Sequence, residues 1–235
     1  MSAKDEENTF EETIVKINSR LIKHYLKNVM FINGTAYAGK STMVKMLADR
    51  YGLVHCGENY DCVPKGIATP QTHPNLCYFQ TMKDWQEFIS RTPQQYSDWI
   101  EGSTQELIEF EIMHLIIVSQ SQKTIVDTNI PVSVLRKIAD YNQVAIMLSP
   151  QSMSVDHFFD RDDPDKVFIK EQIMKSPDPD RAMQNYLACL AKCNSKEIYD
   201  GFANSGFFTI VREDSVKDTK AETMEILARH FGLEG

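Results

Sequence analysis

The residues best suited to chemistry lie near the start of the chain, where the pattern G-x-x-x-x-G-K-[ST] is matched in full by Gly34-Thr35-Ala36-Tyr37-Ala38-Gly39-Lys40-Ser41. Glycines let the backbone curl, so that several N–H groups face one polyphosphate with the positive end of the following helix behind them. In this pattern the lysine contacts the β- and γ-phosphates, and the hydroxyl holds the Mg²⁺ ion that bridges phosphate oxygens. We therefore expect a Mg²⁺-bound nucleoside triphosphate along the loop as far as Thr42, with Lys40 on the phosphates and Ser41 on the metal.

A carboxylate that closes a later apolar run is the second candidate for the metal. Asp127 follows the apolar residues 124–126. Because ligands of open α/β sheets gather at the carboxyl ends of the strands, this side chain would arrive beside the loop and bind Mg²⁺ directly or through water. A second interpretation stays open, because Asp127, Thr128 and Asn129 also suit the capping of a helix that begins at Pro131.

The elements that must position these residues follow from the hydrophobic pattern. Apolar runs without alternation predict strands buried on both faces, at residues 29–33, 53–56, 124–127, 144–148 and 206–211. Helical spacing predicts helices at residues 10–27, 43–51, 82–90, 94–120 with a break at Gly102, 131–141 and 220–231. Since strands and helices alternate, we expect an α/β fold, with a doubly wound, parallel, five-stranded sheet in a single domain over residues 1–235.

Composition and charge exclude several classes of partner. The 25 Lys and Arg residues face 33 Asp and Glu residues, a formal net charge of -8, which disfavours a nucleic-acid partner. The longest apolar stretch, residues 112–118, is far shorter than the roughly 20 residues that span a bilayer. An acidic N-terminus is unlike a signal peptide, and five cysteines without a CxxC pair favour reduced thiols. We expect a cytoplasmic protein without a membrane partner.

A resemblance to a known family rests on residues 28–52. This segment resembles the small-molecule kinase branch of P-loop proteins, the group of nucleoside-monophosphate, shikimate and chloramphenicol kinases. INGTAYAGKST is especially similar to the loop of chloramphenicol phosphotransferase-like proteins, which often have Asn before the first glycine and Ala-Gly-Lys-Ser at the end. The resemblance implies a P-loop kinase-like domain with a helical and irregular acceptor side at residues 57–122 and a helical lid at residues 150–205.

The same resemblance implies roles for four residues outside the loop. A carboxylate after the second strand would take the proton of an acceptor hydroxyl, and Glu58 aligns best with the catalytic Asp of the chloramphenicol-type proteins, while Asp61 stays an alternative. Lid arginines neutralise the transferring phosphoryl group while water is excluded. This implies a catalytic role for Arg161 and a nucleotide contact for Arg181, although Arg161 also suits ion pairs with the aspartates beside it.

Taken together, the residues predict an ATP-dependent phosphotransferase that moves the γ-phosphoryl group to a small-molecule acceptor, with ATP and Mg²⁺ as cofactors. The acceptor would be a nucleoside, nucleotide, metabolite or antibiotic hydroxyl. ATP is favoured over GTP because the GTP-reading motif N-K-x-D is absent from the sequence. In the resembling families the loop of residues 212–215 borders the adenine base. The alternative hypothesis is a regulatory ATP-binding module, or an NTPase without a small-molecule acceptor.

Overall fold

A sheet of five parallel strands forms the centre of the molecule. The computed structural model describes residues 18–58, 60–160, 163–213 and 218–234. The strands are β1 (Val29–Gly34), β2 (Val54–Cys56), β3 (Thr124–Asp127), β4 (Val144–Leu148) and β5 (Phe208–Val211). Their spatial order is β2-β3-β1-β4-β5, and every pair of neighbours is parallel. The fold is therefore α/β, and the predicted five-stranded parallel sheet is confirmed.

Helices connect the strands. The helices between β2 and β3, and those between β4 and β5, form two insertions. They are α2 (Ser19–Tyr25), α3 (Lys40–Tyr51), α4 (Tyr78–Thr81), α5 (Trp85–Ile89), α6 (Pro93–Val118), α7 (Val132–Ile138), the 3₁₀ helix η1 (Tyr141–Gln143), α8 (Gln151–Val155), α9 (Pro164–Met174), α10 (Pro179–Cys193), α11 (Lys196–Ala203) and α12 (Lys220–His230). The helix expected from residue 10 is described only from residue 19, because residues 1–17 lie outside the described part of the chain.

The expected break of the long helix at Gly102 is wrong, because α6 is continuous from residue 93 to residue 118. A Cβ atom at Gly102 would lie 2.5 Å from the side-chain Nδ2 of Asn75. The glycine therefore makes room for the segment that packs on the helix. Its helix-weakening effect of about 1 kcal/mol does not interrupt the backbone.

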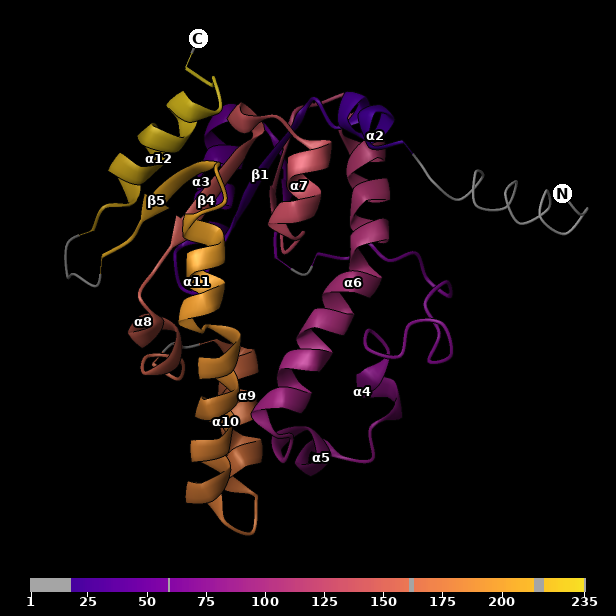
Figure 1. Ribbon diagram of the computed structural model, residues 1–235, viewed down its shortest axis with the longest axis vertical. Helices are drawn as coiled ribbons and strands as arrows, with labels where there is room; N and C mark the ends of the chain where they lie inside the picture. Colours follow the sequence, from indigo (N-terminus) through magenta and orange to yellow (C-terminus); the bar gives the residue numbers. More distant parts are fainter. Residues whose placement is uncertain (1–17, 59, 161–162, 214–217, 235) are drawn as a thin grey trace, which may run out of the picture.

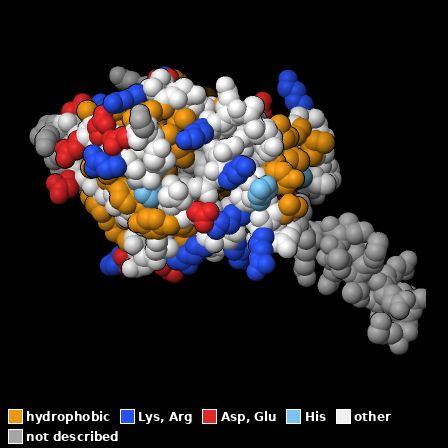
Figure 2. Space-filling model, turned by 90° about the horizontal axis from the view of Figure 1, so that it is seen from above, with side chains coloured by type: hydrophobic (Ala, Val, Ile, Leu, Met, Phe, Trp, Pro, Cys, Tyr) orange, Lys and Arg blue, Asp and Glu red, His pale blue; other side chains and the backbone are white. Residues whose placement is uncertain are grey.

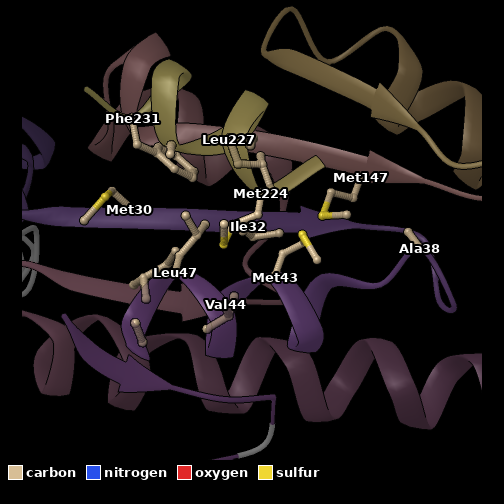
Figure 3. Packing of buried hydrophobic residues seen from close by; sticks show 14 residues of the cluster. Met30, Ile32, Ala38, Met43, Val44, Leu47, Met147, Met224, Leu227 and Phe231 are labelled. Carbon is tan, nitrogen blue, oxygen red and sulfur yellow. The ribbon is translucent and has the colours of Figure 1, made fainter. Parts of the chain in front are cut away.

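Helices cover both faces of the sheet (Figure 1), and on each face they form an apolar layer with the strands. Successive side chains of β1 alternate between them, since Met30 and Ile32 join one cluster while Val29 and Phe31 join the other. Helices α3 and α12 pack on the first face, as Figure 3 shows for ten labelled side chains. Helices α2, α6, α7 and α11 supply the second. The double cover explains why the inner strands β3, β1 and β4 read as continuous apolar runs. The expectation of burial on both faces is wrong for the edge strands β2 and β5, which are partly exposed.

A third apolar cluster lies away from the sheet. It is formed by α5, the first half of α6, α9 and α10, so that the two insertions meet in one helical layer below the sheet in Figure 1. Its core contains Phe88, Tyr96, Ile173, Tyr186 and Leu190, and both tryptophans pack against it. We call this unit the helical layer. It places parts of the expected acceptor side and of the expected lid in direct contact.

The surface carries both signs of charge. Figure 2 shows acidic side chains gathered on the side of α12, with lysines, arginines and apolar groups over the rest of the face seen from above. Among the helices in the described ranges, none combines the length and the apolar character that crossing a membrane would require.

Candidate functional site

The backbone between β1 and α3, called here the glycine loop (residues 34–41), curls tightly. Gly34 has φ +133°, Tyr37 φ +66° and Gly39 φ +90°. A Cβ atom at Gly34 would lie 1.9 Å from the carbonyl oxygen of Met147 in β4, so no other residue fits there without displacing the strand. Thr35 N donates to the same carbonyl at 3.0 Å. The loop is therefore held against β4 from its first residue.

Side chains bind three consecutive carbonyl groups of the loop. Lys40 Nζ donates to the oxygen of Thr35 at 3.2 Å, and Ser149 Oγ donates to that of Ala36 at 2.6 Å. Arg212 Nη1 donates to the oxygen of Tyr37 at 2.9 Å. Ser149 N also donates to Thr35 Oγ1 at 2.7 Å. These bonds fix the peptide planes of the curl.

Helix α3 begins directly after the curl without a side-chain cap. Its N-cap is Gly39, which has no side chain to accept hydrogen bonds from the first-turn amides. The first four N–H groups of any helix lack partners within it, and the helix dipole places partial positive charge at that end. The residues expected to bind phosphate thus surround an uncapped helix start, which is a ready-made anion site.

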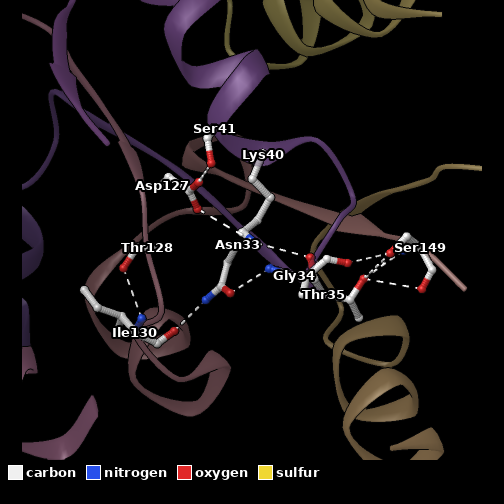
Figure 4. Close-up of polar contacts among 10 residues, drawn as sticks. Asn33, Gly34, Thr35, Lys40, Ser41, Asp127, Thr128, Ile130 and Ser149 are labelled. Atoms are coloured by element: carbon white, nitrogen blue, oxygen red, sulfur yellow. Dashed lines mark hydrogen bonds and ion pairs between the residues drawn. The ribbon is translucent and has the colours of Figure 1, made fainter. Parts of the chain in front are cut away.

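Lys40, Ser41 and Asp127 meet where the loop enters α3 (Figure 4). Ser41 Oγ donates to Asp127 Oδ2 at 2.7 Å, and Lys40 Nζ lies 4.0 Å from Asp127 Oδ1. Both charged side chains are buried, and Asp127 Oδ1 accepts no hydrogen bond. Burial raises the pKa of Asp127. The charge of Lys40 and the hydrogen bond from Ser41 lower this pKa, and the charge of Glu58 raises it. The structure thus brings together the three residues expected to hold phosphate and metal.

These donors fit a magnesium ion. A carboxylate and a hydroxyl are the hard oxygen ligands that Mg²⁺ prefers, and the buried Asp127 Oδ1 has a lone pair to offer. The other interpretation of Asp127, as a helix cap, is wrong. Helix α7 has Pro131 at its N-cap and no side-chain cap.

The two acceptor-side carboxylates differ in their surroundings. Glu58 and Asp61 are both exposed in the segment after β2. Glu58 is close enough to Asp127 for its charge to influence that carboxyl. Asp61 instead adds to the raised pKa of Cys62, after the larger effects of burial and Glu111. Of the two candidates, Glu58 is the one associated with the Lys40–Ser41–Asp127 group.

Glu111 on α6 is a buried acid that was not predicted from the sequence. Only 5% of it is exposed. Burial raises its pKa to about 7; a hydrogen bond from Thr128 lowers the value, and the charge of Asp127 raises it. The signal lay in the helical spacing, which places Glu111 on the apolar face that carries Ile108 and Leu115. A carboxylate in that register is a reason to look for a polar neighbour.

The two lid arginines have different outcomes. Arg161 lies outside the described residues. Arg181 is exposed at the start of α10 and lines a cavity with residues of α5. Both helices belong to the helical layer, which lies below the sheet in Figure 1. The structure does not bring Arg181 to the glycine loop.

A lid lysine and a loop tyrosine connect the expected lid to the loop. Lys166 Nζ lies 4.8 Å from the centre of the Tyr37 ring and 5.2 Å from that of Phe158. The hydroxyl of Tyr37 donates to the carbonyl oxygen of Phe158 at 2.7 Å. No role was predicted for Lys166. Its signal was weak, because a lysine beside Asp163 also suits a surface ion pair, which it forms at 3.3 Å.

A cavity of about 520 Å³ adjoins the glycine loop on the side of β5 and α12. Ala38, Gly39 and Thr42 of the expected nucleotide site line it, together with Ile210 and Arg212. Arg212 and Glu213 belong to the segment expected to border a base, whereas residues 214 and 215 lie outside the described residues. A planar group of nucleobase size fits a cavity of this volume next to the loop.

Comparison of the chain with protein-family models, curated proteins and solved structures gave no match.

Proposed function

We propose that this protein is an ATP-dependent phosphotransferase with a P-loop kinase-like fold, acting on a small-molecule acceptor. The observation that carries the proposal is the meeting of an uncapped helix start with Ser41 and the buried Lys40 and Asp127 at the end of a curled loop. The position of the loop at the carboxyl end of the central strand, between β3 and β4, supports the fold assignment.

On the donor side, the loop amides and Lys40 bind the triphosphate, and Ser41 and Asp127 hold the metal. Mg²⁺ supplies positive charge that offsets the charge developing on the phosphate oxygens. One carboxylate and one hydroxyl are fewer ligands than Mg²⁺ takes, so phosphate oxygens and water would supply the others. The base occupies the 520 Å³ cavity, where Arg212 contributes to one wall.

On the acceptor side, Glu58 orients the acceptor hydroxyl and takes its proton as the new oxygen–phosphorus bond forms, while the bond between the γ-phosphorus and the bridging oxygen breaks and ADP leaves. Its proximity to Asp127 supports this role, because the acceptor oxygen has to reach the γ-phosphate next to the metal. The helical layer brings residues of the acceptor side and the lid together, which suits a site that excludes water during transfer.

Calorimetric titration of Mg·ATP into the full chain tests the donor side. We expect Lys40→Ala to weaken binding by about 100-fold, since charge-assisted hydrogen bonds contribute roughly 1.5–3 kcal/mol each. Lys45→Ala is the matched control, because Lys45 is exposed on the same helix and forms an ion pair with Asp49. Wild-type protein that is folded and yet binds no Mg·ATP would overturn the proposal.

A phosphoryl-transfer assay over nucleosides, nucleotides, sugars and antibiotics tests the acceptor side. We expect ATP consumption to depend on one class of acceptor, and Glu58→Gln to slow transfer by about 100-fold, the effect of losing a positioned general base. Asp61→Asn, three residues away, should leave the rate near that of the wild type. Acceptor-independent hydrolysis would instead favour an NTPase or a nucleotide-dependent switch.

A further inference from the structure

A second cavity, called here the arginine cavity, lies between α4, α5 and the first turns of α6, with a volume of about 490 Å³. It shares no lining residue with the cavity beside the glycine loop. Trp99 is the last residue of α6 that lines it, and Ile108 is the first residue of α6 that packs on the sheet. The helix between them spans about 14 Å at roughly 1.5 Å per residue, so the arginine cavity is distinct from the proposed phosphate site. Figure 1 shows the three helices next to one another below the sheet.

Arg91, between α5 and α6, is the only cationic side chain among the described residues that line this cavity. No carboxylate in the described part of the chain lies within 4.0 Å of its guanidinium, the limit for an ion pair. Its Nη1 is buried without a hydrogen-bond partner. The guanidinium carbon lies 3.7 Å from the centre of the Tyr78 ring and 5.4 Å from that of Trp99. The rings hold the cation in place, and its planar fork keeps the capacity to bind a carboxylate.

Hydrogen bonds fix the walls of the arginine cavity. Asn75 N and Nδ2 donate to Glu106 Oε1 at 3.2 and 2.6 Å, and Trp99 Nε1 donates to Asn75 O at 3.0 Å. The hydroxyl of Tyr78, whose ring stacks on the guanidinium, donates to Glu87 Oε1 at 2.8 Å. A cavity with fixed walls loses little conformational freedom when a ligand binds, which favours affinity.

Two carboxylates also line the cavity, and they differ in their remaining capacity. Glu87 uses both oxygens, since Oε1 accepts from Tyr78 and Oε2 accepts from Lys83 N at 3.0 Å. Asp98 accepts from Gln94 Nε2 at Oδ1, at 2.6 Å. Within the described ranges, Asp98 Oδ2 accepts no hydrogen bond and Asp98 forms no ion pair. Asp98 can therefore bind an ammonium group.

We propose that the arginine cavity binds a small zwitterion of the amino-acid type, with its carboxylate on Arg91 and its ammonium group on Asp98. A simple anion would be repelled by Glu87 and Asp98, and a simple cation by Arg91, whereas a molecule with both charges satisfies both sides. Trp99 gives the side chain of the ligand an apolar surface. The inference goes beyond the proposed function, because none of these residues belongs to the site of phosphoryl transfer.

Fluorescence titration of the full chain tests the site, because Trp99 lines the cavity. The probes are the standard amino acids, with acetate and methylammonium as compounds that carry one charge each. We expect at least one amino acid to change the emission saturably. Acetate and methylammonium should bind at least about tenfold more weakly, since each lacks one charge-assisted contact. Acetate that binds as tightly as the best amino acid, or no saturable change in emission and no calorimetric heat with any amino acid, overturns the proposal.

Arg91→Gln removes the partner of the carboxylate. We expect this variant to bind the best amino acid at least about tenfold more weakly. Arg20→Gln is the control, because it removes the same charge from an exposed position on α2 and should change the affinity by less than about twofold. Equal affinities in wild type and a folded Arg91→Gln variant would refute the assignment.

Asp98→Asn covers the case in which Arg91→Gln does not fold, because Asp98 is exposed. We expect the amino acid to bind about threefold more weakly and acetate to lose no affinity, a difference that general loosening of the helices would not produce. Glu101→Gln, which alters another exposed acid of α6, should leave both affinities unchanged. An unchanged affinity for the amino acid in Asp98→Asn would overturn the proposal.

These measurements contain no nucleotide, so they are independent of the proposed function. A wild-type chain that binds the amino acid but not Mg·ATP would overturn the phosphotransferase proposal and leave the zwitterion site standing. Binding of Mg·ATP without binding of any amino acid would have the opposite meaning.

Discussion

The buried carboxyl of Glu111 makes the free energy of unfolding depend on pH. Its pKa rises from 4.5 to about 7 on folding, because burial disfavours the charged form. The folded state therefore holds a proton between these values, so the stabilisation is complete below about pH 4.5 and is lost as pH rises through about 7. A shift of this size corresponds to about 3 kcal/mol.

Glu111→Gln should remove this dependence, because an amide does not titrate in this range. We compare the free energy of unfolding of the variant with that of the wild type, measured with urea without Mg²⁺. We expect this difference to change by about 3 kcal/mol in favour of the variant from pH 5 to pH 8. Glu109→Gln on the exposed side of α6 should show no such gain. A constant difference between Glu111→Gln and wild type at the two pH values would contradict the burial effect.

Among individual residues, the sequence predicted those whose role can be inferred from the residues around them in the chain. Lys40 and Ser41 belong to a contiguous motif, and Asp127 follows from the rule that parallel strands end at one edge. Glu111 and Lys166 became visible only in the fold. Acids and lysines are common on helices, and only packing decides which of them face a site.

The turn from β1 into α3 depends on one glycine more than on any other part of the loop. Gly34→Ala places a Cβ atom 1.9 Å from Met147 O at φ +133°, and we expect a loss of about 3 kcal/mol or more in unfolding free energy. Gly52→Ala is the matched control. It also has a positive φ, +64°, but nothing lies within 4 Å of the added atom, so about 1 kcal/mol is expected. If chemical denaturation showed similar losses of unfolding free energy in both variants, the close approach of Gly34 to Met147 O would be refuted.

The prediction of strands and helices succeeded where the pattern within the element indicated the structure. It failed where a contact with a residue distant in sequence determined the structure. The inner strands β3, β1 and β4 read as apolar runs because both of their faces are covered, whereas β2 and β5 lie at the sheet edges and are partly exposed. The break predicted at Gly102 did not occur, since the glycine accommodates Asn75, a contact that no pattern within the helix reveals. The order of the strands in space likewise comes from packing between elements and is absent from any single segment.

The molecule as a whole contains a sheet with two apolar layers and a separate helical layer. Trp85 and Trp99, the only tryptophans in the sequence, both pack in the helical layer, so their fluorescence reports on that unit alone. We expect Phe88→Ala to lower the urea midpoint seen by fluorescence more than that seen by far-ultraviolet circular dichroism, because its cluster shares no residue with the other two. Leu227→Ala, in the layer of α3 and α12, should shift the dichroism midpoint more. Coincident midpoints in both variants would mean that the layers unfold as one.

During synthesis on the ribosome, the central strand β1 is made long before the two strands that pair with it. Val29 pairs with Thr124, and Phe31 pairs with Val144, so neither neighbour of β1 exists until about a hundred further residues have been made. At 5–20 residues per second, that delay is on the order of ten seconds. Throughout it, the nascent chain presents an apolar strand with two unsatisfied edges, a form that holding chaperones recognise and that aggregates when translation stops early. Messages truncated before residue 124 should therefore yield insoluble fragments.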